Sequence, residues 1–158
     1  MNSALTVKLL RQAGAGDDSV YPELYHQVCH QFTVGAVAYL AVPHLVDIVH
    51  GIDVRRWVWP LTIVGTVAAA RATYPQSDLQ IPEALRAEYL AANLDAMRLT
   101  AEALGHSSWQ PSDSQELLAT LAALHGHTNL AMLLFLHGGV TKLSCPMCGE
   151  YIEYMESQ

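Results

Sequence analysis

The spacing of apolar residues predicts a chain of helices from the start of the sequence to about residue 137. Apolar side chains recur every three to four positions, which places them on one face of an α-helix. Glycine and proline interrupt this pattern where helices are expected to begin or end. Seven helical segments are predicted in this way, over residues 3–13, 22–31, 36–51, 55–74, 83–104, 112–125 and 129–137.

The segment 83–104 has the clearest helical pattern. Its core face is predicted to carry Leu85, Tyr89, Ala92, Ala96, Leu99 and Ala103, with Leu90, Leu94, Met97 and Ala101 alongside. The charged residues that are predicted to lie away from this face are Arg86, Asp95, Arg98 and Glu102. In the next segment, Ser112 and Gln115 have the spacing of a capping box at a helix start.

Strand-like alternation appears only at the C-terminus. Residues 140–144 and 150–154 suit the two strands of a small hairpin. We therefore predict an all-α fold, with a helical domain over residues 1–139. The hairpin over residues 140–158 is predicted to be an appendage that packs on the helical domain or caps it.

One segment resembles bacterial HEAT-repeat-like proteins of the armadillo type. It reads LYHQVCHQFTVGAVAYLAVPHLVDIV over residues 24–49, and the matching features are the His30-Gln-x-Thr-Val34 stretch and the later Val42-Pro-His-Leu-Val46. The chain departs from the family at Gly35 and Ala36, where a tyrosine and a proline are expected. The resemblance implies stacked helix pairs that act mainly as protein-binding surfaces, and some relatives belong to bacterial toxin and immunity neighbourhoods. It implies no catalytic residue.

The most specific chemical motif is Cys145-Pro-Met-Cys148-Gly149, which is similar to the knuckle of a zinc ribbon. Two thiolates on a tight turn closed by glycine can point at one metal ion. A thioredoxin-like dithiol would need a βαβ unit around the motif, which the helical pattern does not supply. We predict a structural zinc site, with a metal-free turn and a redox pair as the alternatives.

A closed zinc site needs four ligands, and the motif supplies two. The best candidates for the other two ligands lie in the segment YHQVCHQ, where His26, Cys29 and His30 have the spacing of one helix face. We predict that Cys29 and His26 join Cys145 and Cys148 as ligands. Two alternatives stay open: Cys29 is a small buried hydrophobe, or two chains share the metal and form a homodimer.

Composition and charge narrow the class of protein. Hydrophobic residues make up 51% of the 158 residues and charged residues 15%, as in a globular chain. Eight Lys plus Arg against fifteen Asp plus Glu give a net charge of −7, which argues against a nucleic-acid partner. The N-terminus lacks the apolar region of a signal peptide, so we expect a cytoplasmic protein. The apolar segments are shorter than the roughly 20 residues of a membrane span.

Two functions fit these patterns. The first is a non-enzymatic module that binds another protein. The net charge favours a basic partner, and immunity to a basic toxin is one concrete form of this function. The second is a zinc-dependent hydrolase in which Cys145, Cys148 and a histidine hold an open zinc that activates water. The pair His44 and Asp47 has the spacing to orient a general base, but the sequence favours an ordinary polar edge of the helix, because no third partner or nucleophile motif accompanies it.

Overall fold

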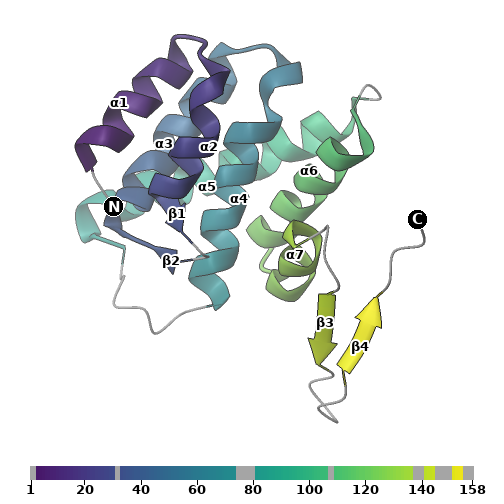
Figure 1. The fold of residues 1–158 in the computed structure, drawn as a ribbon. Coiled ribbons are helices and arrows are strands. Elements are labelled where there is room, and N and C mark those ends of the chain that lie inside the picture. Colours follow the sequence, from purple (N-terminus) through teal and green to yellow (C-terminus); the bar gives the residue numbers. More distant parts are fainter. Residues whose placement is uncertain are drawn as a thin grey trace.

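The computed structural model describes residues 3–30, 33–73, 81–106, 109–136, 141–144 and 151–154. These residues are mostly helical, which confirms the predicted all-α class (Figure 1). The α-helices are α1 (Ser3–Gly14), α2 (Tyr21–Val28), α3 (Ala36–Gly51), α4 (Val58–Thr73), α5 (Glu83–Leu104), α6 (Pro111–Leu124) and α7 (Thr128–Phe135). Two short 3-10 helices, η1 (Asp18–Val20) and η2 (Val54–Arg56), precede α2 and α4.

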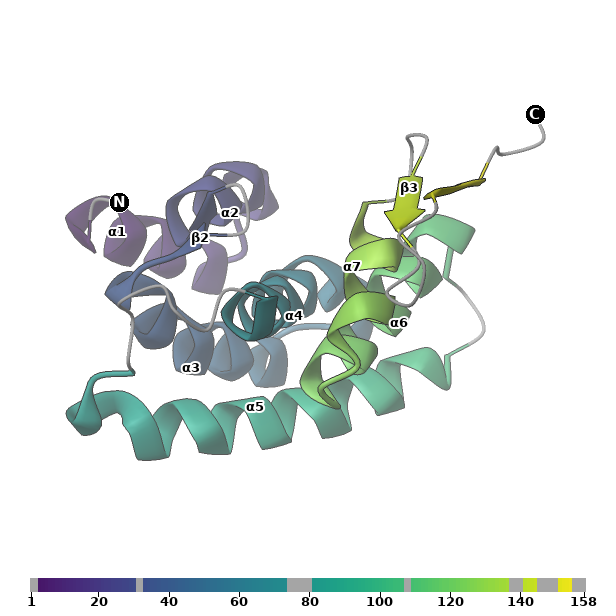
Figure 2. The ribbon, with the colours of Figure 1, turned by 90° about the horizontal axis from the view of Figure 1, so that it is seen from below.

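The helix α4 lies at the centre of the fold, as its nearly continuous apolar sequence predicts. Ten of its residues are buried, from Pro60 to Ala70 with only Ala68 partly exposed. It packs against α2, α3 and α6, while α5 runs along α3 and α6 (Figure 2). The last two helices, α6 and α7, are joined by a short turn at Gly126 and pack against each other, as predicted.

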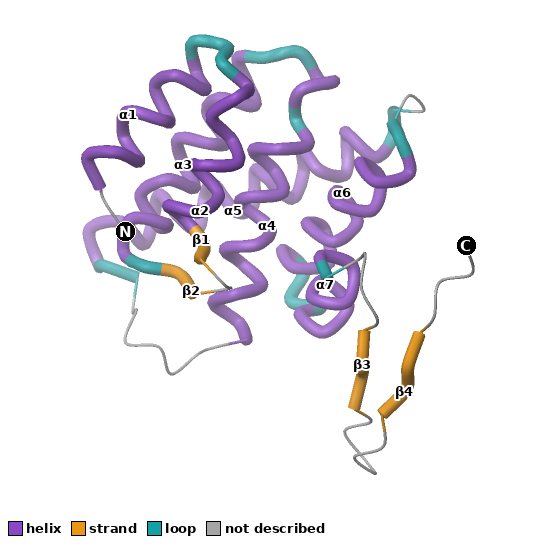
Figure 3. The backbone as a smooth tube through the Cα atoms, in the orientation of Figure 1, coloured by secondary structure: helices purple, strands orange, loops and turns teal. Residues whose placement is uncertain are grey.

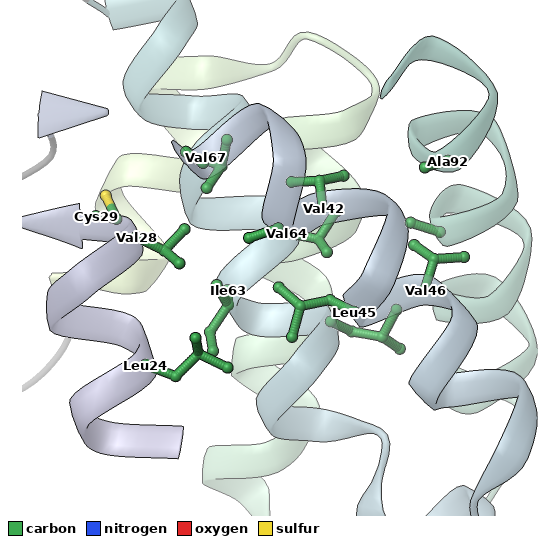
Figure 4. Close-up of a cluster of buried hydrophobic side chains, with 14 of the residues drawn as sticks. Leu24, Val28, Cys29, Val42, Leu45, Val46, Ile63, Val64, Val67 and Ala92 are labelled. Atoms are coloured by element: carbon green, nitrogen blue, oxygen red, sulfur yellow. The ribbon is translucent and has the colours of Figure 1, made fainter. Parts of the chain in front are cut away.

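Buried aliphatic side chains from several helices form the main core (Figure 4). Leu24 and Val28 of α2, Leu45 of α3 and Ile63 of α4 are all fully buried in it. In α1, α2 and α5 the buried residues recur every three or four positions, as predicted, whereas those of α4 are nearly continuous.

The helix α2 ends earlier than predicted. Cys29 follows it with extended backbone angles (φ −139°, ψ 93°) and begins the strand β1 (Cys29–His30). This strand pairs antiparallel with β2 (Thr33–Val34) (Figure 3). In this pair Cys29 lies opposite Val34. Valine and threonine favour extended backbone, which competes with continuation of the helix. The prediction of a helix over residues 22–31 is therefore wrong at its C-terminal end.

The start of α6 also differs from the predicted capping box. Gln110 is the N-cap, and the Asp113 carboxylate accepts a hydrogen bond from the Gln110 backbone at 3.3 Å. Pro111 stands at the first helical position, where its missing N–H costs no hydrogen bond. Gln115 instead donates its side-chain amide to the carbonyl of Leu134 at 2.8 Å, which ties α6 to α7.

Near the C-terminus the backbone forms the antiparallel strands β3 (Thr141–Ser144) and β4 (Tyr151–Tyr154), with Thr141 opposite Tyr154. The connection that carries Cys145 and Cys148 lies outside the described residues. No helix among the described residues is long and apolar enough to cross a membrane.

Candidate functional site

The predicted metal ligands fall in different surroundings. Cys29 is fully buried in the main core, beside Val28 in Figure 4. His26 lies within α2 and is exposed, with its ring edge-on to Tyr25 at 6.2 Å between centroids. Because α2 ends at Val28, these two residues do not share one helix face.

The described residues contain no group of three or more His, Cys, Asp or Glu side chains that could hold a metal ion. Cys145 and Cys148 lie outside them, so the predicted zinc site stays a prediction. The burial of Cys29 among aliphatic side chains suits the alternative that it is a small core residue.

A groove between α1 and α3 is a concave site among the described residues. Its volume is about 410 Å³, within the roughly 300–1,000 Å³ of small-ligand sites. The side chains of Leu10, Val7, Ile48 and Ile52 form its apolar floor, and Leu10 is buried. The other residues that line it are Arg11, Gly14, His44, Asp47 and Gly51.

Both walls of this α1–α3 groove follow helical spacing. On α1 the lining residues stand at positions 7, 10, 11 and 14, and on α3 at positions 44, 47, 48 and 51. Each wall therefore carries apolar and charged side chains and ends in a glycine, Gly14 on α1 and Gly51 on α3. Gly51 leaves open space in the groove, because an added Cβ atom would meet nothing within 4 Å, whereas a Cβ atom on Gly14 would contact Ile48 at 3.7 Å.

His44 and Asp47 both line this groove and are exposed. No hydrogen bond joins them within the described part of the chain, so the geometry does not favour an oriented general base. Arg11 reaches the same groove from α1, and the sequence pattern alone does not predict this because it does not show that α1 and α3 are neighbours.

The outer face of α5 is a second candidate site. Leu90 and Leu94 are 47% and 68% exposed, although their positions predict burial beside the core. They belong to an apolar seam that repeats at alternating steps of three and four positions along the helix, the spacing of a coiled-coil interface. The seam consists of Ala87, Leu90, Leu94, Met97 and Ala101, while Leu104 at the end of the helix packs against the main core. In Figure 2 the lower side of α5 faces away from α3, α4 and α6.

An acidic column runs along α5 between the seam and the core face, and Arg98 stands between this column and the seam. The column consists of Glu88, Asp95 and Glu102, spaced seven residues apart and therefore on one side of the helix. Arg98 bonds Asp95 at 2.9 Å and Glu102 at 3.4 Å, and His50 of α3 contacts Asp95 at 2.5 Å. The hydrogen bonds from His50 and then Arg98 lower the pKa of Asp95, while its partial burial opposes them.

Comparisons with protein-family models, with curated proteins and with solved structures found no match to this chain. The HEAT-like resemblance therefore stays a prediction, while the helical fold rests on the structure. The spacing of the seam on α5 could have indicated an exposed interface, since the helix is apolar on two sides and only one side can face the core.

Proposed function

We propose that the chain is a non-enzymatic protein-binding module that packs the outer face of α5 against a helix of another protein. The observation that carries this proposal is the exposure of Leu90 and Leu94 in the middle of a 22-residue helix. Large apolar side chains that cluster on a surface are typical of interaction sites. The chemistry that this face offers is contact and not catalysis, because its seam holds no nucleophile or acid–base group.

The spacing of the seam favours a helix as the partner segment. Steps of three and four positions match the knobs-into-holes packing of two helices. A partner helix with leucines at the same spacing would cover Leu90 and Leu94 together. Recognition of an amphipathic helix by an apolar helical surface is a recurrent binding mode.

The net charge of −7 and the acidic column favour a partner with lysine or arginine around its apolar residues, whose long side chains reach past Arg98. Glu88 forms no ion pair within the described residues, and Arg98 is shared between two carboxylates. A second copy of this chain would suit this face less well, because both copies carry the same net charge of −7. A basic toxin is one concrete class of partner, and the chain would then act as its immunity protein.

The test uses two synthetic helical peptides of three heptads each. In both peptides leucine recurs at alternating steps of three and four positions, the spacing of the seam on α5. One has lysine on its flanks and the other has glutamate at the same places. Fluorescence anisotropy is expected to show binding of the lysine peptide, and weaker or no binding of the glutamate peptide. Leu90→Ser with Leu94→Ser should weaken the binding at least about tenfold, because each leucine loses about 1.5 kcal/mol or more of burial.

The matched control is Leu118→Ser with Leu130→Ser, which removes two leucines of similar exposure, 48% and 50%, from α6 and α7. This variant should bind the lysine peptide like the wild type. Equal weakening in both double variants, or equal binding of both peptides, would contradict the proposal. A photo-crosslinking residue at position 94 then identifies the natural partner, and recovery of a second copy alone would assign the face to self-association.

A further inference from the structure

We propose that the α1–α3 groove binds a short apolar peptide through both of its free ends, with Arg11 holding the carboxylate and Asp47 holding the ammonium group. This site is separate from the outer face of α5 and goes beyond the proposed function. The groove combines an apolar floor with one cationic and one anionic side chain.

Arg11 and Asp47 are both available for a ligand. Neither side chain forms an ion pair or a side-chain hydrogen bond within the described part of the chain. By contrast, Arg56 forms an ion pair with Asp18 elsewhere on the surface. Both line the same groove and both are exposed. A guanidinium is well suited to a carboxylate, and a carboxylate accepts hydrogen bonds from an ammonium group.

The separation of the two helices favours a peptide over a free amino acid. Helices in contact lie roughly 8–10 Å apart between axes, and Arg11 and Asp47 stand on opposite walls. The ends of an extended dipeptide span about 7 Å, at about 3.3–3.6 Å for each residue. The two charged groups of a single amino acid share one carbon atom and are much closer together.

The floor sets the preference for apolar side chains. Leu10, Ile48 and Ile52 present aliphatic surface, and the groove is large enough for leucine-sized groups. Gly51 leaves room at one end, because a Cβ atom added there would meet nothing within 4 Å. A peptide with two leucine side chains therefore matches the walls, the floor and the charges of this groove.

The experiment titrates the full chain with the dipeptide Leu-Leu and follows backbone amide chemical shifts by NMR. For a ligand of about 17 non-hydrogen atoms, ordinary ligand efficiency corresponds to a Kd of about 0.2 mM. Acetyl-Leu-Leu lacks the ammonium group and Leu-Leu-amide lacks the carboxylate. Each of these probes should bind about tenfold more weakly than Leu-Leu.

Variants assign the two ends of the peptide. Arg11→Gln should weaken Leu-Leu about tenfold and leave Leu-Leu-amide unchanged. Asp47→Asn should weaken Leu-Leu to a similar degree and leave acetyl-Leu-Leu unchanged. Lys8→Gln is the matched control, since it removes a positive charge one turn away on α1 from a residue that does not line the groove. It should leave all three affinities as they are.

A filling variant tests the groove itself. Gly51→Leu should abolish binding, while its melting temperature stays equal to the wild type or rises, because leucine is the better helix former. Binding that survives Gly51→Leu would place the peptide elsewhere. Absence of binding by Leu-Leu at several millimolar, or equal affinity for all three probes, would overturn the proposal.

Discussion

Gly65 determines how closely α4 and α6 approach each other. A Cβ atom placed on Gly65 would lie 2.6 Å from the Cα atom of Thr120, which is inside any normal contact distance. The Thr120 hydroxyl also donates to the carbonyl of Leu61 at 3.3 Å across the same crossing. The backbones therefore touch at a point where only glycine leaves enough space.

Gly65→Ala is expected to destabilise the fold by about 2–3 kcal/mol, because the methyl group meets backbone atoms that cannot rotate away. For a chain of this size, such a loss lowers the melting temperature by roughly 5–10 °C. Thermal unfolding followed by circular dichroism measures it. The control is Gly51→Ala, whose new methyl group meets nothing within 4 Å and which should leave stability equal or higher. Equal melting temperatures for the wild type and Gly65→Ala would contradict the close approach.

Single residues also show what periodicity leaves undecided at a helix end. The apolar pattern continues through Cys29, but the backbone becomes extended there and begins β1. The spacing of three residues from His26 to Cys29 therefore no longer places the two side chains on one helix face. Periodicity reports which residues are buried, and Cys29 is indeed buried. It does not report whether the backbone that carries them is helical or extended over only two or three residues.

At the scale of elements, the sequence predicts where α5 begins and ends but not which of its apolar sides faces the core. Its bounds follow from the sequence, since a proline precedes Glu83 and Gly105 follows Leu104. Its orientation does not, because apolar residues occupy both the core face and the outer seam. The core face was predicted well, with Tyr89, Ala96 and Leu99 buried. The placement of Leu90 and Leu94 beside it was wrong, because the width of a buried stripe depends on how many neighbours the helix has.

The contact between α3 and α5 includes a pH-sensitive ion pair. His50 and Arg98 both hold the Asp95 carboxylate in its charged form and lower its pKa from the ordinary value of 3.8. A carboxyl whose pKa is lower in the folded state stabilises the fold above its ordinary pKa, and this contribution disappears as the pH falls toward the lowered value.

Asp95→Asn is therefore expected to reduce the fall in stability between about pH 5 and pH 2. The loss at pH 7 should be modest, at most about 1 kcal/mol, because the pair is partly exposed. Urea unfolding at several pH values measures both quantities. Glu88→Gln is the matched control, since Glu88 lies on the same helix and forms no ion pair in the described region. If the two variants have the same pH dependence, the His50–Asp95 contact contributes no pH-linked stability.

At the scale of the whole molecule, the sequence predicts the helices better than the sites between them. Seven segments were located because each helix carries its own periodic signal. The α1–α3 groove depends on two helices separated by residues 15–35, and no local pattern states that they pack together. His44 and Asp47 were therefore recognised as a pair, whereas Arg11 completes the groove only through the tertiary fold.

The predicted zinc site also concerns the whole molecule, because its predicted ligands come from distant parts of the chain. We expect the full-length protein to carry about one structural zinc ion per chain. Cys145→Ser with Cys148→Ser should abolish zinc binding, as measured by mass spectrometry of the metal content. Removal of zinc by a chelator should leave the helical circular dichroism nearly unchanged, because the described core is built from α1 to α6.

The variant Cys29→Ala tests whether Cys29 is a zinc ligand or only a small residue of the core. Loss of zinc in this variant would support Cys29 as the third ligand, whereas retained zinc with a lower melting temperature would assign it to the core alone. Replacement by alanine avoids a buried hydroxyl, which would itself destabilise the fold. A ratio of about one zinc to two chains, together with a molar mass that halves on chelation, would instead indicate a site shared between two copies. Wild-type protein that is purified with zinc present and retains none would show that the motif is a metal-free turn.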